Sequence, residues 1–248
     1  MSDFRILTLD IETRPMQVYC WGIWQQNIGI NQIIDAGGIL CFAAKWHGEK
    51  DVMFSSIKDG EKAMLRKAHK LLDEADAVVG WNSQRFDTRW FNGQFVKHGL
   101  RKPSPYAQID LMKSAKAFQY LPSYKLDFSA RWLGIGQKVE TGGFDLWKKC
   151  MDGDEKAWRT MEKYNKGDVK LTEAVFDQLR SGGWVKGLPN HSIGGGHCCP
   201  NCGGTKLKAN GYRETQTRSY KRWLCLSCGT SSQSVASEPW KAELKVLA

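Results

Sequence analysis

The sequence predicts an α/β fold, in which helices cover a central mixed sheet, followed by a small cysteine-rich module. Two observations indicate the α/β class: short apolar and β-branched runs come first, and longer segments with apolar residues at helical spacing follow them. The third observation is a concentration of cysteines, because five of the eight in the chain lie between residues 198 and 228.

The predicted strands are short apolar runs bounded by turn residues. The first, Phe-Arg-Ile-Leu-Thr-Leu-Asp-Ile, begins at Phe4, and Gly37-Gly38 precedes the second. A histidine-glycine pair separates the second strand from the third, and a short buried run ending at Gly80 forms the fourth. The four strands cover residues 4–11, 39–44, 52–54 and 77–80.

The predicted helices have apolar residues that recur every three or four positions. One of them stops at Gly134, and Gly167 is expected to weaken the helical structure between the last two. The helices cover residues 61–74, 89–98, 126–133, 154–164 and 169–180. Three strands, then a helix, a strand and more helices are typical of a layered α/β domain.

Composition and charge change near residue 182. Residues 183–196 are rich in Gly, Pro, Asn and Ser, which predicts a linker between a first domain at 1–182 and a second at 197–248. The formal charge is +10, and from residue 183 onward nine basic residues face three acidic ones. This excess favours a polyanionic partner, although a basic protein without such a partner has the same composition.

No segment resembles a signal peptide, and no apolar run is long enough to cross a bilayer. We therefore expect an intracellular, cytoplasmic protein with no membrane partner. In such a protein, clustered cysteines favour a metal site over disulfides. The three scattered cysteines, Cys20, Cys41 and Cys150, are expected to be buried thiols.

Two acidic side chains occupy alternate positions of the first predicted strand. Asp10 and Glu12 lie in the run Leu-Thr-Leu-Asp-Ile-Glu-Thr, and residues two apart on a strand point to the same side. Two carboxylates on one side suit Mg²⁺ or Mn²⁺, which prefer oxygen ligands. Taken alone, the pattern is equally typical of a solvated strand end.

Two further polar motifs fall where open α/β sheets hold their ligands. Asn82 and Asp87 follow the buried strand 77–80, and such strand ends border ligand sites. Tyr164 and Asp168 are four residues apart, so in a helix they share one face. The alternatives are turn and helix-capping roles for the first pair, and a packed ring and a surface charge for the second.

In this order the motifs resemble the three exonuclease motifs of the DEDD superfamily, in its tyrosine subgroup. Asp-Ile-Glu-Thr, Asn-x-x-x-Phe-Asp and Tyr-x-x-x-Asp are similar to the motifs of the proofreading domains of family B DNA polymerases. The resemblance spans residues 4–182 and implies an RNase H-like fold. It also implies a 3′→5′ exonuclease that releases 5′-mononucleotides from single-stranded DNA. No polymerase palm or fingers segment follows, so a stand-alone nuclease is expected.

The resemblance implies a two-metal mechanism with a role for each acidic residue. Asp10 would bridge two Mg²⁺ or Mn²⁺ ions. Glu12 and Asp168 would bind the ion that activates water, and Asp87 would hold the other. Tyr164 would orient the attacking water, because a tyrosine hydroxyl is a poor base at neutral pH.

Substrate contacts are also implied around the first two motifs. Thr13, Asn82 and Phe86 would contact the terminal nucleotides of a single-stranded or 3′-ended DNA. Within the same class of enzyme the substrate is alternatively RNA, since recognition of the 2′-hydroxyl cannot be read from sequence. The other aromatic residues near the second motif are expected in the core: Trp81, Trp90 and Phe91.

Two Cys-x-x-Cys-Gly motifs predict a zinc ribbon within residues 197–248, which also include a C-terminal tail. Each motif presents two thiolates from a tight turn, four thiolates fit tetrahedral Zn²⁺, and a β-hairpin fits between the motifs. The predicted ligands are Cys199, Cys202, Cys225 and Cys228. His197 or Cys198 is an alternative to Cys199. A redox pair and an iron–sulfur cluster are the competing interpretations.

The role of the ribbon stays open between two interpretations. The basic and aromatic stretch from Arg218 to Trp223 suits a grip on nucleic acid. A structural or protein-docking module, with replication or repair proteins as partners, is the alternative. For the whole chain, the alternatives to the exonuclease are a non-catalytic nucleic-acid adaptor and a transposase-like or junction-cutting endonuclease.

Overall fold

The computed structural model describes residues 4–193 and 196–239. The chain divides into two compact units, Met1–Val175 and Phe176–Ala248, which are described separately below. The predicted domain boundary at residue 182 and the linker at 183–196 stay predictions. The predicted C-terminal tail beyond residue 239 lies outside the described residues.

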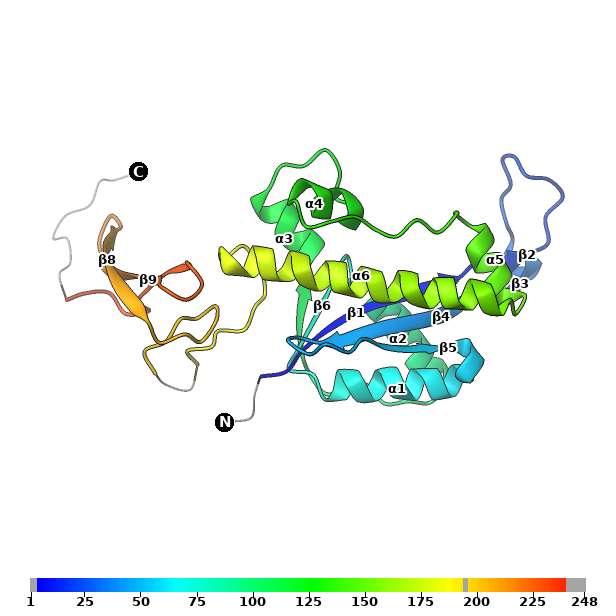
Figure 1. The fold of residues 1–248 in the computed structure, drawn as a ribbon, viewed down its shortest axis with the longest axis horizontal. Helices are drawn as coiled ribbons and strands as arrows, with labels where there is room; N and C mark the ends of the chain where they lie inside the picture. The colour runs from blue at the N-terminus through cyan, green and yellow to red at the C-terminus, as the bar shows by residue number, and fades with distance from the viewer. Residues whose placement is uncertain (1–3, 194–195, 240–248) are drawn as a thin grey trace. The chain divides into compact units, whose positions relative to one another are not determined.

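The first unit is built on a five-stranded mixed sheet with the order β5-β4-β1-β6-β7 (Figure 1). The central strand β1 pairs antiparallel with β4 and parallel with β6. The strands are β1 (Ile6–Arg14), β4 (Gly38–Trp46), β5 (Met53–Ser56), β6 (Ala77–Gly80) and β7 (Ala107–Asp110). β1 and β6 therefore end at the same edge of the sheet, which is where open α/β sheets bind ligands.

Helices cover both faces of this sheet (Figure 1). α1 and α2 pack on one face, and α6 runs along the other. The helices are α1 (Glu61–Asp73), α2 (Asp87–Lys97), α3 (Leu111–Phe118), α4 (Leu126–Trp132), α5 (Asp145–Met151) and α6 (Glu155–Ser181), with short 3₁₀ turns η1 (Ile30–Gln32) and η2 (Ile57–Asp59). An α/β fold with a mixed sheet flanked by helices is thus confirmed.

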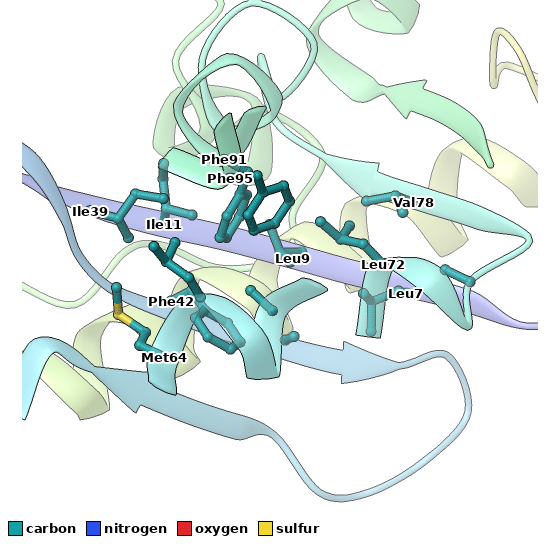
Figure 2. Packing of buried hydrophobic residues seen from close by; sticks show 14 of the residues in the cluster. Leu7, Leu9, Ile11, Ile39, Phe42, Met64, Leu72, Val78, Phe91 and Phe95 are labelled. Carbon is teal, nitrogen blue, oxygen red and sulfur yellow. The ribbon is translucent and has the colours of Figure 1, made fainter. Parts of the chain in front are cut away.

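The main core lies between the sheet and α1 and α2. Figure 2 shows Leu7, Leu9 and Ile11 of β1 among side chains that include Met64 of α1 and Phe91 of α2. Because successive residues of a strand point to opposite faces, burying these three apolar side chains turns Asp10 and its neighbours at 8 and 12 toward the α6 face. The core thereby fixes the direction of the acidic side chains.

The last helix is longer and more regular than the sequence predicts. α6 is one continuous helix of 27 residues, whereas two segments with a weak point at Gly167 were expected. A glycine inside a helix costs only about 1 kcal/mol. The burial of Trp158, Met161 and Val169, with Asn165, outweighs that cost. β7, α3 and α5 are among the other elements of this unit that the sequence patterns did not predict.

A two-stranded hairpin follows β1, formed by β2 (Gln17–Val18) and β3 (Ile33–Asp35). Its loop contains Cys20, which is exposed, so the prediction of a buried thiol was wrong there. The large apolar side chains around it are themselves exposed, and Trp21 beside the cysteine is 99% exposed. The other two scattered cysteines, Cys41 and Cys150, are buried as predicted.

The second unit contains a three-stranded antiparallel sheet with the order β10-β9-β8. Its strands are β8 (Leu207–Glu214), β9 (Ser219–Cys225) and β10 (Ser231–Gln233). The predicted hairpin is therefore present as β8 and β9, with one further short strand. Two loops of this unit carry the paired cysteines, next to β8 and at the end of β9.

Candidate metal centres

Three carboxylates from distant parts of the sequence converge on the α6 face of the sheet. Asp10 and Glu12 project from β1, and Asp168 projects from α6. One carboxylate oxygen from each of the three lies within 4.8 Å of the others. The sequence predicted a group of four carboxylates that also included Asp87, and the roles of these residues remain predictions.

The α6 helix positions its contribution through neighbouring residues on the same face. Asn165 is fully buried, and its Nδ2 donates to Asp10 Oδ2 at 2.7 Å, which fixes that carboxylate against the helix. Asp168 is 1% exposed, and its buried Oδ1 has no hydrogen-bond partner in the part of the chain that the structure describes. An unpartnered carboxylate oxygen in such a position is costly unless a cation or a water satisfies it.

Asp87 lies beside this group but outside it. It begins α2 and is 4% exposed, and its Oδ1 accepts a hydrogen bond from Ile11 N at 3.1 Å. This bond joins the start of α2 to the backbone of β1, between the two acidic residues of that strand. The structure therefore brings Asp10, Glu12 and Asp168 together, with Asp87 attached to their strand.

The turn between β6 and α2 is tightly built. A Cβ on Gly80 would lie 2.6 Å from Ser83 Cβ and 3.2 Å from Leu9 O, so this position requires glycine. Asn82 adopts a left-handed backbone conformation with φ 59°. Its N donates to Asp110 Oδ1 at 3.1 Å, which holds the turn against the end of β7. The turn is thus fixed by β1 on one side and by β7 on the other.

Burial raises the pKa of all four carboxyl groups, and repulsion from the others of the group adds to this effect for Asp10 and Glu12. Burial, together with the charge of Asp168, raises the pKa of Glu12 to about 8. Burial raises the pKa of Asp87 to about 7, and burial with repulsion from its neighbours raises that of Asp10 well above the usual range. The pKa of Asp168 is also raised by burial, although Lys138 acts in the opposite direction. Carboxyl groups that resist ionisation together are stabilised as carboxylates when a cation binds.

A lysine that the sequence patterns did not reveal reaches into this group. Lys138 Nζ lies 2.5 Å from Asp168 Oδ2 and 3.2 Å from Tyr164 Oη. The neighbouring acidic charge raises the pKa of Lys138 despite its partial burial, so the side chain is a cation. It comes from the loop between α4 and α5, where no periodic pattern marks it. Tyr164 is half-buried one helical turn before Asp168, and burial raises its pKa.

A pocket of about 430 Å³ opens next to these side chains, with Thr13, Phe144 and Trp147 among its lining. The ring of Trp147 lies edge-on to Tyr164, with centroids 6.0 Å apart. Its indole N–H donates a hydrogen bond to Glu12, which partly offsets the rise in the pKa of that carboxyl group. The wall of this pocket is therefore continuous with the carboxylate group.

The remaining residues of the second motif are placed as follows. Phe86 is 41% exposed and packs edge-on against Trp90, with centroids 6.4 Å apart. Phe91 is buried in the core as predicted, whereas Trp81 and Trp90 are only half-buried. The predicted substrate contacts of Thr13, Asn82 and Phe86 stay predictions.

The donor set of the first centre fits a divalent cation with oxygen ligands. Three carboxylate oxygens lie within 4.8 Å of one another, and Oδ1 of Asp168 has no hydrogen-bond partner among the described residues. Neutral, unmetallated packing would favour apolar or amide side chains at such positions. Mg²⁺ and Mn²⁺ are bound by such hard oxygen donors.

The second centre is formed by four cysteines in the second unit. Their sulfurs lie within 4.8 Å of one another, and they belong to Cys199, Cys202, Cys225 and Cys228. Two of the sulfur pairs are 3.7 Å apart. Burial acts to raise the pKa of the Cys228 thiol, but hydrogen bonds with Thr230 lower it, to about 6.

The alternatives to Cys199 as a ligand lie elsewhere in this unit. Cys198 Sγ donates to His191 O at 3.5 Å, and the exposed His197 packs its ring against Trp223. The four clustered sulfurs fit the tetrahedral sulfur coordination that zinc adopts in structural sites.

Comparisons with known proteins agree with this architecture. A sequence model of the RNase_H superfamily matches residues 7–180. A solved structure of the family B DNA polymerase from the hyperthermophilic archaeon Pyrobaculum calidifontis is similar, with a TM-score of 0.53 and 18% sequence identity. The likeness covers 72% of this chain and 25% of that polymerase chain, and at this identity it shows the fold. Among curated proteins, no sequence match was found.

Within the described residues, no helix combines the length and the apolar character that a membrane span requires. The superfamily match includes all four acidic residues of the three motifs, together with the sheet and the helices that position them. Since it extends over more than half of the sequence and the mixed sheet agrees with the predicted fold, the chain belongs to the RNase_H superfamily.

Proposed function

We propose that this chain is a divalent-metal-dependent 3′→5′ exonuclease that acts on single-stranded or frayed 3′ ends of DNA. The observation that carries the proposal is the convergence of Asp10, Glu12 and Asp168, with one carboxylate oxygen left without a partner. Membership of a superfamily of nucleases and the structural likeness to a DNA polymerase support it. The four cysteines are proposed to hold one structural Zn²⁺.

The chain's own residues would divide the work as follows. Asp10, Glu12 and Asp168 hold the cations, and Asn165 keeps the first of these carboxylates in place. Asp87 fixes the β1 backbone through Ile11 N and, at the edge of the group, would help to hold the second cation. Bound Mg²⁺ or Mn²⁺ supplies a water of lowered pKa and neutralises charge on the phosphate.

Two side chains beside the carboxylates act on the phosphate and the water. Tyr164 Oη, which accepts a hydrogen bond from Lys138 Nζ, would orient the attacking water without taking its proton, because burial raises the pKa of the tyrosine and keeps it protonated. The Lys138 ammonium, which lies beside Tyr164 and Asp168, would stabilise the negative charge on the phosphate oxygens of the substrate. The terminal nucleotide enters along the pocket lined by Thr13 and Trp147.

The test uses end-labelled oligonucleotides of DNA and RNA in parallel, with Mg²⁺, Mn²⁺ or no divalent ion. We expect successive release of 5′-mononucleotides from the 3′ terminus, and Asp10→Ala or Asp168→Ala should reduce the rate by at least about 10³-fold. Tyr164→Phe should lose less, since it removes an orienting hydroxyl and leaves the cation ligands in place.

Asp51→Asn is the matched control, because this exposed carboxylate lies in the turn between β4 and β5. It should retain the activity of the unmodified chain. Near-normal turnover in folded Asp10→Ala would contradict the proposal. Cleavage at internal positions would indicate an endonuclease instead. Faster turnover of RNA than of DNA would indicate that RNA is the substrate.

A further inference from the structure

The three-stranded sheet of the second unit has two chemically different faces. In β9, Lys221 and Trp223 point to one face, and Tyr220 and Arg222 point to the other, because side chains alternate along a strand. Directly paired residues of neighbouring strands share a face. The register therefore assigns the neighbours in β8 and β10 to one face or the other.

The first face is occupied by contacts within the unit. Lys221 Nζ lies 4.7 Å from the centroid of the Trp223 ring, and the His197 ring packs edge-on against the same indole at 4.4 Å. Together with residues of the neighbouring strands, these side chains line a pocket of about 340 Å³. The charge of Lys221 is therefore engaged by an aromatic ring of its own unit.

The second face, here named the basic face, carries cations that are exposed. Tyr220 pairs with Arg213, and Arg222 pairs with Gln233, so these four side chains lie on one side of the sheet. Lys208 joins them through its pairing with Leu224. Three cations thus lie over the two adjacent strands β8 and β9, and Arg213 Nη1 donates to Gln233 Oε1 of β10 at 3.0 Å, which braces its guanidinium.

Acidic residues do not balance this charge. Residues 196–239 contain six Lys and Arg and only two Glu. Glu214 pairs with Ser219, which places it with the first face, and it accepts a hydrogen bond from Ser219 Oγ at 2.9 Å. Glu238 follows β10 and lines the pocket of the first face. Within the described residues of β8, β9 and β10, the register assigns no carboxylate to the basic face.

We propose that the basic face binds single-stranded nucleic acid, with phosphates on Lys208, Arg213 and Arg222 and a base on the ring of Tyr220. The inference rests on the proposed function, since it makes the second unit a second contact with the same substrate. Uncompensated cations beside an aromatic ring are the chemistry of single-strand binding. The core of a protein interface is rich in apolar side chains and poor in Lys, although Arg and Tyr are common there; among the described residues of the three strands, this face presents Leu224 as its one aliphatic side chain, and it is half-buried.

Two substrates separate this contact from the carboxylate centre. The p-nitrophenyl ester of thymidine 5′-monophosphate is small enough to occupy only the carboxylate centre, whereas a single strand of about 30 nucleotides also offers phosphates and bases to the basic face. Affinity for the strand is measured with Ca²⁺ in place of Mg²⁺ to prevent cleavage. Chelators are avoided, because they would remove metal from the cysteines.

The test variant is the full chain with Lys208→Gln, Arg213→Gln and Arg222→Gln combined. We expect affinity for the long strand to fall by on the order of 10-fold at 0.1 M salt, and the slope of log K against log salt to fall by about 2, because each single-strand phosphate contact contributes about 0.7. Turnover of the small ester and zinc content should equal those of the unmodified chain.

The matched control removes the same number of charges from the first unit. Lys62, Arg66 and Lys70 lie along the exposed side of α1, and their combined change to glutamine should leave the slope unchanged. Tyr220→Leu should weaken binding several-fold with an unaltered slope, since stacking carries no charge.

If the triple variant of the basic face kept the affinity for the long strand and the salt slope of the unmodified chain, the proposal would be overturned. The basic face would then bind a protein partner or no partner. Equal losses in the ribbon and α1 variants would also overturn it, since they would reflect net charge alone. Failure of the proposed function is seen separately, as absence of ester turnover in the unmodified chain.

Discussion

Lys138 is the residue whose position most affects the carboxylate centre. Its ammonium lies 2.5 Å from Asp168 Oδ2, where it neutralises that carboxylate but also repels any cation bound there. Lys138→Met should therefore increase the affinity for Mn²⁺ by about 5-fold or more, since removing one like charge is worth at least about 1 kcal/mol. The same change should lower the turnover of bound substrate. Isothermal titration calorimetry and single-turnover kinetics measure the two effects.

Lys170→Met is the control for this prediction, because Lys170 is an exposed lysine on the same helix. It should alter neither quantity. If Lys138→Met weakened Mn²⁺ binding, the lysine would be supporting the arrangement of the carboxylates and not opposing the cation.

Gly80 sets the path of the turn that leads to Asp87. In Gly80→Ala the new methyl group would meet Ser83 Cβ at 2.6 Å and Leu9 O at 3.2 Å, so the turn has to move. We expect a loss of about 1–3 kcal/mol in the free energy of unfolding, typical of an overpacked site, together with a loss of activity. Urea denaturation and the nuclease assay measure the two.

Gly93→Ala is the matched substitution, because a Cβ at that position in α2 would meet no atom within 4 Å. There the better helix propensity of alanine should stabilise the protein by up to about 1 kcal/mol. Equal changes in the free energy of unfolding for Gly80→Ala and Gly93→Ala would mean that the turn at Gly80 accommodates the added methyl group.

Among the elements, α6 allows a direct test of why a glycine is accepted inside a helix. A Cβ at Gly167 would meet only Val139 Cγ2, at 3.5 Å, which is an ordinary contact. Gly167→Ala should therefore stabilise the protein by about 0.5–1 kcal/mol, as measured by urea denaturation. A destabilisation of that size would instead indicate that the helix needs a deformable point between Tyr164 and Asp168.

The elements that sequence patterns predicted are those whose side chains repeat. In β1 the alternation of Leu7, Leu9 and Ile11 with polar residues indicates both the strand and the side on which Asp10 lies. The four-residue interval between Tyr164 and Asp168 places both on one face of α6 in the same way. Local spacing was sufficient because each pair lies within one element.

What the sequence did not predict depends on contacts between distant elements. Lys138 comes from an irregular loop with no period, and its approach to Asp168 depends on how that loop folds against α6. Asp110 resembles an ordinary helix cap and indeed accepts hydrogen bonds from the first turn of α3. Its bond to Asn82 N joins two loops that are 28 residues apart. In the sequence, the one signal for the role of Asp110 is its position at the end of a short strand-like run.

At the scale of the whole molecule, the carboxylate centre couples stability to pH and to bound cations. The folded chain keeps a proton on Glu12 up to a pKa of about 8 and on Asp87 up to about 7, whereas both lose it near their ordinary values when unfolded. The folded state therefore binds more protons than the unfolded state between about pH 4 and pH 8. Stability from these groups is present at low pH and is lost as the pH rises through that window.

The resulting prediction is that the protein without added divalent ions melts at a lower temperature at pH 8 than at pH 5.5, and that Mn²⁺ reverses most of the loss at pH 8 but little at pH 5.5. Mn²⁺ acts at high pH because it binds the deprotonated carboxylates, and ligand binding to the folded state alone raises stability.

Glu12→Gln removes one of the titrating groups, so it should melt at a higher temperature than the unmodified protein at pH 8, respond less to pH and gain less from Mn²⁺. The second unit contributes equally to both proteins, so the difference between their melting curves reports on the first unit. If the melting temperature of Glu12→Gln responded to pH and to Mn²⁺ as that of the unmodified protein does, Glu12 would not be part of the cation site.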